Sequence, residues 1–133
     1  MTAIHASSLL RRILIVDAVT SGASGIAMLA FAELFASLLQ LPVELVREAA
    51  IIMLLFAAFV GFVVSRREPA RVAVWAVIVL NAVWVVDSIL LLFTDWVAPN
   101  ALGYVFVIAQ ATMVLVFADL EYMGLKRSTT VAA

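Results

Sequence analysis

The chain contains no cysteine, a single histidine and few charged residues. Without cysteine it forms no disulfide and no thiolate-ligated metal or redox site. The one histidine, His5, lies in the N-terminal tail, so the rest of the chain offers no histidine base, haem ligand or histidine metal site. The five glycines form no phosphate-binding loop. These absences predict a protein that is not an enzyme and that carries no metal or cofactor.

Charge is scarce and apolar residues are abundant. Of 133 residues, 13% are charged and 67% are hydrophobic, whereas soluble domains carry about 25% charged residues. A bilayer core of about 30 Å requires about 20 consecutive, mostly apolar helical residues. The sequence predicts one all-α transmembrane domain over residues 1–133, a bundle running up-down-up-down through four spans, at residues 10–30, 49–65, 72–93 and 101–118.

The first span resembles a signal peptide in outline, with Arg11 and Arg12 before an apolar stretch and a small-x-small sequence at residues 30–32. Polar residues within the stretch, among them Asp17, make a poor leader, and the run is long enough to cross a membrane. We therefore expect a retained span.

Positive charges gather at one set of span ends. Only Arg47 lies at the other set, beside Glu44 and Glu48. Lysine and arginine mark cytoplasmic loops of membrane proteins. The pattern predicts an integral protein of a bacterial inner (plasma) membrane, with both termini cytoplasmic. The residues that carry this prediction are Arg11, Arg12, Arg66, Arg67, Arg71, Lys126 and Arg127.

Two connecting segments carry structural signals. Residues 31–40 are amphipathic at helical spacing, which favours a short interfacial helix after a bend, although a plain extension of the first helix is the alternative. Residues 66–70 form a short link, which predicts that the second and third spans pack as an antiparallel pair. Small residues four apart, such as Ala18 and Gly22 or Ala57 and Gly61, mark helix contacts.

Carboxylates within the spans are functional candidates because burying a charge in a membrane is costly. Asp17 lies only about 7 Å beyond Arg12 along the helix, and Asp119 is similarly close to Lys126. We interpret both as partners in salt bridges at the inner rim of the membrane.

Asp87 lies deeper, about 24 Å along the helix from Arg71. One interpretation is a ligand-binding polar pocket between helices. The alternative is ordinary hydrogen bonding between helices, with Asn81 and Gln110 paired because they lie at similar depths. The candidate ligand-binding residues are Asn81, Trp84, Asp87, Ser88 and Gln110.

Three motifs resemble those of a group of small, uncharacterised bacterial four-span membrane proteins. They are the Leu41-Pro42 pair, the segment from Asn81 to Ser88 with Trp84 and Asp87 inside it, and the close at residues 121–127. In that group an acid often stands where this chain has Asn81. The resemblance implies the four-span fold and no particular activity.

Three functions remain open. The first is an accessory or scaffold subunit of a larger membrane complex, favoured by the small size of the chain and its lack of catalytic residues. The second is binding of a lipid or another apolar ligand between helices, and the third is a small oligomeric transporter. The partners expected are membrane lipids, together with a larger complex or further copies of the chain. A net charge of −1 gives no indication of nucleic-acid binding.

Overall fold

A computed structural model describes residues 2–131 of the chain. It contains four long helices, α1 (Ser8–Ala30), α3 (Val43–Ser65), α4 (Arg71–Leu91) and α5 (Ala101–Lys126), and one short helix, α2 (Ala32–Leu39). Two short strands, β1 (Ile4–His5) and β2 (Thr129–Thr130), flank them. Each long helix is long and apolar enough to cross a membrane. The four-helix bundle with a short additional helix is confirmed, and the chain fits an integral membrane protein.

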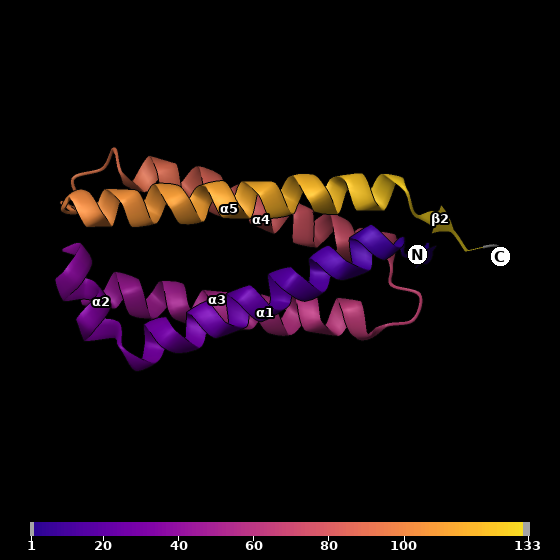
Figure 1. The fold of residues 1–133 in the computed structure, drawn as a ribbon, viewed down its shortest axis with the longest axis horizontal. Helices are drawn as coiled ribbons and strands as arrows, with labels where there is room; N and C mark the ends of the chain where they lie inside the picture. Colours follow the sequence, from indigo (N-terminus) through magenta and orange to yellow (C-terminus); the bar gives the residue numbers. More distant parts are fainter. Residues whose placement is uncertain (1, 132–133) are drawn as a thin grey trace.

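The long helices run alternately in opposite directions and form two pairs (Figure 1). Helix α1 packs along α3, and α4 packs along α5, while α1 also touches α5. The pairs meet where both termini lie, called here the termini end, and separate toward α2, called here the α2 end. The termini end and the α2 end of the bundle thus differ in how tightly the two helix pairs are joined.

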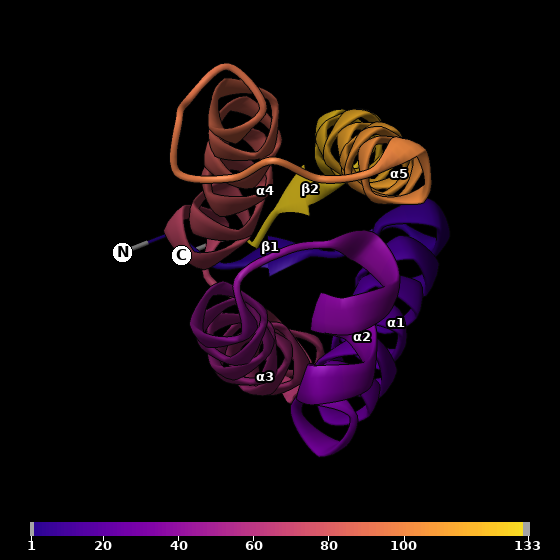
Figure 2. The same ribbon diagram turned by 90° about the vertical axis from the view of Figure 1, so that its left-hand side faces the viewer.

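The expectation that the second and third spans would pack together along their length is wrong, because α3 packs mainly on α1. The N-terminal segment explains the difference. The Ile4 amide donates to the Pro69 carbonyl at 3.0 Å, and the Arg71 amide donates to the Thr2 carbonyl at 2.8 Å. The fully buried Ile4 side chain joins the apolar cluster that contains Val63 of α3 and Val74 of α4. The backbone of the N-terminal segment, with β1, therefore lies between α3 and α4 at the termini end (Figure 2).

The termini end is held by backbone pairing that sequence patterns did not predict. Strand β1 pairs with β2 in antiparallel register, Ile4 opposite Thr130 and His5 opposite Thr129. Two-residue strands are too short to show alternation. Ser7 caps α1 by accepting from the Leu10 amide, and its hydroxyl donates to the Gly124 carbonyl at 2.7 Å. The first turn of α1 is thereby fixed to the last turns of α5.

Arg11 ties α1 to the end of α3. Its guanidinium donates to the Val64 carbonyl at 2.8 Å and to the carbonyls of Arg66 and Arg67 at 3.4 and 3.3 Å. The last carbonyls of a helix have no partner within the helix and carry partial negative charge. Arg11 supplies both the missing donors and the complementary charge.

Small residues bring α1 and α3 close together. A methyl group at Gly22 would lie 3.6 Å from the Ala57 side chain, and one at Gly25 would lie 2.9 Å from the Leu54 side chain. Close backbone approach is the usual basis of helix packing in membranes. The predicted contact role of Gly22 is confirmed, whereas that of Gly61 is wrong within the described chain, because a methyl group there would meet no atom within 4 Å.

At the α2 end the chain bends after Ala30 and begins a separate helix, so the interfacial helix is present at Ala32–Leu39. Gln40 ends it in the left-handed conformation, with φ of 54°. Asn100 caps α5 by accepting from the Gly103 amide at 2.8 Å and donates to the Leu38 carbonyl at 2.9 Å. One asparagine therefore joins the end of α2 to the start of α5.

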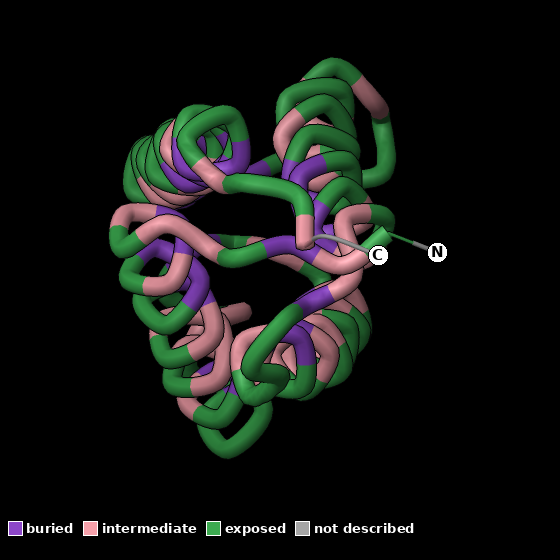
Figure 3. The backbone as a smooth tube through the Cα atoms, turned by 90° about the vertical axis from the view of Figure 1, so that its right-hand side faces the viewer, coloured by how far each residue is buried: buried purple, intermediate pink, exposed green. Residues whose placement is uncertain are grey.

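Burial follows the inward helix faces, and the outer faces are exposed (Figure 3). Exposed large apolar residues occur on all four long helices, as expected of surfaces that contact lipid tails. One apolar core cluster, including Leu10, Val60 and Val77, fills the termini end. A smaller cluster around Met28, Val46 and Ala50 joins α1, α2 and α3. Only the first cluster spans both helix pairs with fully buried residues.

Candidate functional site

A buried polar cluster joins three helices about midway along the bundle. Asn81 of α4 donates through Nδ2 to Asp17 Oδ2 of α1 at 2.8 Å and to Glu121 Oε1 of α5 at 2.8 Å. The exposed fractions are 1% for Asp17, 4% for Asn81 and 0% for Glu121. Within residues 2–131 these are the only buried polar or charged side chains. We call them the carboxylate–amide cluster.

Hydrogen bonding in this cluster is incomplete. Ser21, one turn from Asp17 on α1, donates to Asp17 Oδ1 at 3.2 Å, so both oxygens of Asp17 are bonded. Glu121 Oε2 is buried and has no hydrogen-bond partner among the described residues. An unsatisfied buried polar atom costs about 1–3 kcal/mol, and more when charged. The cluster therefore contains one open hydrogen-bonding position.

Neither carboxylate of the cluster is neutralised by a basic side chain. Across residues 2–131 the only ion pairs join Arg47 to Glu33 and Glu44. The interpretation of Asp17 as a partner in a rim salt bridge is therefore wrong. Arg11, the nearest basic residue on the inward side of α1, is engaged by the carbonyls at the end of α3.

Asp119 is exposed and forms no ion pair with any described residue, so its predicted salt bridge is also absent. Asp119 lies two positions before Glu121, and two helical residues point in directions about 200° apart. Glu121 thus faces the bundle, whereas Asp119 faces outward.

The predicted hydrogen bond between Asn81 and Gln110 is wrong. Gln110 Oε1 instead accepts from Trp84 Nε1 at 2.7 Å, and its Nε2 donates to the Val107 carbonyl at 2.9 Å. Asn81 bonds instead to Glu121, which lies eleven residues, or about 16 Å, from Gln110 along α5. The prediction matched Asn81 and Gln110 by depth, but the two residues do not lie at the same depth. Trp84, one turn along α4 toward the α2 end, reaches Gln110, whereas Asn81 reaches Asp17 of α1 and Glu121 of α5.

Asp87 and Ser88 do not join the cluster. Asp87 is exposed, Ser88 is half-buried, and neither side chain hydrogen bonds to a described residue. Asp87 lies about 120° around α4 from Asn81, at about 100° per residue. That separation is wide enough to place one side chain at the centre of the bundle and the other at its surface.

Glu121 was not among the candidate residues, although the sequence contained a signal for it. The buried residues of α5 include Val107, Ala111, Ala118 and Gly124, which recur at helical spacing, and Glu121 falls on the same face. The expected span ended at residue 118, but α5 continues to Lys126. Extending the periodicity past Asp119 would have placed Glu121 inside.

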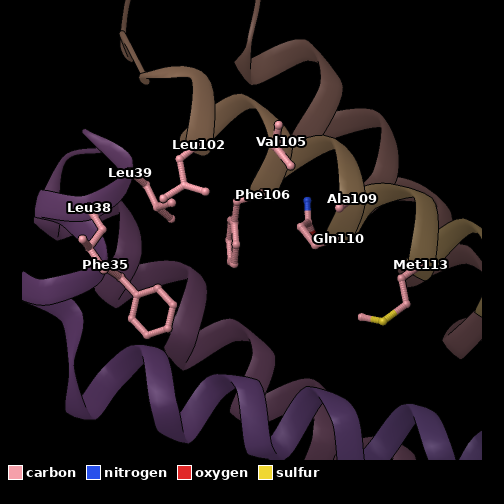
Figure 4. Close-up of a pocket in the computed structure, with 9 residues that line it drawn as sticks. All are labelled: Phe35, Leu38, Leu39, Leu102, Val105, Phe106, Ala109, Gln110 and Met113. Atoms are coloured by element: carbon pink, nitrogen blue, oxygen red, sulfur yellow. The ribbon is translucent and has the colours of Figure 1, made fainter.

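An apolar groove lies between α2 and α5 at the α2 end (Figure 4). Its volume is about 510 Å³. The Phe35 and Phe106 rings, which line it, contact each other with centroids 6.2 Å apart and ring planes tilted by 55°. Gln110 is its only polar lining residue, and both ends of that amide are already hydrogen bonded. The lining residues are Phe35, Leu38, Leu39, Leu102, Val105, Phe106, Ala109, Gln110 and Met113.

These two features differ in the chemistry they permit. The carboxylate–amide cluster offers acid groups and one open position, and among the described residues no three histidine or acidic side chains are grouped to hold a metal ion. The groove offers shape and apolar surface without free hydrogen-bonding groups. The chain matches no protein-family model, no curated protein and no solved structure.

Proposed function

We propose that the protein is a lipid-binding membrane protein that holds one acyl chain of a membrane lipid in the groove between α2 and α5. The volume of about 510 Å³ carries the proposal, because ligand pockets typically measure about 300–1,000 Å³. The lining suits an acyl chain, since no unpaired polar group of Gln110 would have to be desolvated by it.

The position of the groove favours a lipid over a water-soluble apolar ligand. Leu38, Leu102 and Val105 line it and are also exposed on the outer surface of the helices. A lipid tail can therefore enter sideways from the surrounding hydrocarbon. Gln40 lies at the adjacent end of α2 and is exposed, so a polar head group there would find its side-chain amide as a hydrogen-bonding partner.

We further propose that the protein resides in a bacterial plasma membrane with both termini in the cytoplasm. Arg11, Arg66 and Arg71 support this orientation because they gather with the other basic residues at the termini end. At the α2 end Arg47 pairs with Glu33 at 3.6 Å and with Glu44 at 2.8 Å. In this orientation the groove opens to the outer leaflet. Reporter fusions at both termini test it, and an external reporter signal from either would refute it.

Photocrosslinking tests the acyl-chain proposal. The probe is phosphatidylglycerol with a diazirine on one acyl chain, in vesicles of phosphatidylethanolamine and phosphatidylglycerol. Ala109 lines the groove, so Ala109→Phe should fill it and reduce labelling of residues 35–39 and 102–113 several-fold. Ala58→Phe is the matched control, because Ala58 is exposed on α3 away from the groove. Equal labelling of all exposed helix faces, or labelling insensitive to Ala109→Phe, would overturn the proposal.

A second candidate function is that of an accessory or scaffold subunit. It is favoured by Gly61 of α3, where an added methyl group would meet no atom within 4 Å. A partner helix can approach closely at such a position. On native gels of membrane extract, Gly61→Leu should return the protein from a larger complex to the size of the isolated chain. Ala58→Leu should not, and comigration unaffected by Gly61→Leu would refute this surface as a docking site.

A further inference from the structure

Two carboxyl groups approach each other inside the bundle without a neutralising cation. Asp17 Oδ2 and Glu121 Oε1 each lie 2.8 Å from the same Asn81 nitrogen, so they are within twice that distance of each other. A buried charge that is not paired is strongly disfavoured, and a like charge beside it adds repulsion. A pair of this kind is relieved when one group binds a proton.

We propose that Asp17, Asn81 and Glu121 form a proton-binding site in which one proton is shared between the two carboxyl groups. The proton resides on Glu121 and is donated to Asp17, and Asn81 orients both groups from a third helix. The site holds one negative charge when occupied and two when empty. It does not depend on the proposed binding of an acyl chain.

The open position on Glu121 is the independent observation that points to a proton. Glu121 Oε2 is buried and has no partner among the described residues, and the bonds of Asp17 and Glu121 to the same Asn81 nitrogen hold the two carboxyl groups side by side. Two ionised carboxylates are both acceptors and cannot bond to each other. A proton between them supplies the missing donor and satisfies the open oxygen.

Charged groups on the neighbouring elements do not replace that proton. Arg11 of α1 is bound by carbonyls, Lys126 of α5 lies over the Tyr122 ring, and none of the other groups pairs with the cluster. Helix α3 carries its ionisable residues at the α2 end, within its first two turns. The remaining titratable or charged groups on the elements around the cluster are His5, Arg12, Arg71, Asp87, Tyr104, Asp119, Tyr122, Glu44, Arg47 and Glu48.

The Asn81 amide favours a proton over a metal cation. Its NH₂ group points between the two carboxyl groups and donates to both. A cation in the same place would need an oxygen ligand from the amide. The donor instead stabilises the negative charge that remains after one proton has bound.

Binding of the proton affects how firmly the two helix pairs are held together. Asp17 belongs to the α1–α3 pair, whereas Asn81 and Glu121 belong to the α4–α5 pair. Loss of the proton removes the bond between Asp17 and Glu121 and places two like charges across the joint. We therefore expect the pairs to be joined most firmly when the site is protonated.

Infrared spectroscopy tests the site directly in purified, lipid-reconstituted protein. At neutral pH the wild type should show the carbonyl band of a protonated carboxyl group, shifted by transfer to D₂O. Glu121→Gln should remove the band, because the amide cannot carry the proton and Asp17 remains ionised. Asp17→Asn should shift the band to a different frequency, because the acceptor changes from a carboxylate to an amide.

Asp119→Asn and Asp87→Asn are matched controls, since both carboxyl groups are exposed, and both should retain the wild-type band. Absence of the band in the wild type at neutral pH, or its persistence in Glu121→Gln, would overturn the proposal. If Glu121→Gln fails to fold, an unshifted band in Asp17→Asn would overturn it as well. Thermal stabilisation by sodium chloride but not by choline chloride, lost in both variants, would replace the proton with a sodium ion.

Discussion

The two ends of the bundle use different means to join the same helix pairs. At the termini end, main-chain hydrogen bonds, the Arg11 guanidinium and a fully buried apolar cluster connect all four long helices. At the α2 end, the helix α2 and the Asn100 side chain form the bridge, and a groove of about 510 Å³ lies beside them. The comparison suggests that the bundle is anchored at one end and adaptable at the other, with the carboxylate–amide cluster at the boundary.

Removing the hydrogen bonds of the carboxylate–amide cluster should have the largest effect on the stability of the bundle. Asn81→Leu removes the donor shared by Asp17 and Glu121 and leaves both carboxyl groups without it. We expect a loss of at least about 1.5–3 kcal/mol in the free energy of unfolding, the range for one hydrogen bond to a charged group. Denaturant unfolding in bicelles measures it. A loss no greater than that of Ala58→Leu would show that the cluster does not join the helix pairs.

Glycine substitutions compare the stiffness of the two ends. A methyl group at Gly124 would lie 2.7 Å from the Leu10 Cα atom, and one at Gly103 would collide with the Leu39 carbonyl oxygen. Overpacking typically costs about 1–3 kcal/mol. Gly124→Ala should lower the melting temperature more than Gly103→Ala, because the first turn of α1, which the methyl group at residue 124 would meet, is fixed by Ser7 and Arg11.

Gly61→Ala serves as the control for both, because the added methyl group meets no atom within 4 Å. It should be neutral or stabilising, since glycine in a helix is less favourable than alanine by about 1 kcal/mol. Equal destabilisation by Gly103→Ala and Gly124→Ala would contradict the expectation that the helices are held more rigidly at the termini end than at the α2 end.

A smaller effect is expected from the Trp84–Gln110 hydrogen bond, which lies next to the groove. Hydrogen bonds between membrane helices contribute about 0.6 kcal/mol to stability on average and about 1.7 kcal/mol at most. A double-mutant cycle with Trp84→Phe and Gln110→Leu should show coupling of this size. The cycle of Asn81→Leu with Gln110→Leu should be additive, and the reverse pattern would contradict the observed partners.

The smallest effect is expected at Arg47, which pairs with Glu33 and Glu44 at the surface of the α2 end. Exposed ion pairs contribute about 0–1 kcal/mol. Arg47→Gln should therefore lower the unfolding free energy by less than Asn81→Leu, Gly124→Ala or Gly103→Ala, and raising the salt concentration should abolish the difference. A loss comparable to that of Asn81→Leu would mean that α2 is held to α3 mainly by charge.

Helix positions and directions followed from the sequence because length and hydropathy determine which segments can cross a bilayer. The hydrogen-bond and ion-pair partners of the polar side chains did not follow from the sequence. Asp17 lay close to Arg12 in sequence, but Arg12 is exposed while Asp17 faces the bundle. Asn81 and Gln110 lie about ten residues from a loop each, but these loops are at opposite ends of the bundle, and Asn81 bonds to Glu121, about 16 Å from Gln110 along α5. The buried position of Ile4 in the apolar core was not predicted either, because Ile4 belongs to the N-terminal tail, outside every apolar span.

The joint between Ser7 and the last turn of α5 has a consequence for the order of assembly. Ser7 hydrogen bonds to Gly124 and Ser128, which lie more than one hundred positions later in the chain. A ribosome delivers α1 to the membrane long before it makes those partners. The beginning of α1 is therefore fixed only after residues 124–128 have been made and have reached the termini end, so this joint forms later than the contacts between α1 and α3 can.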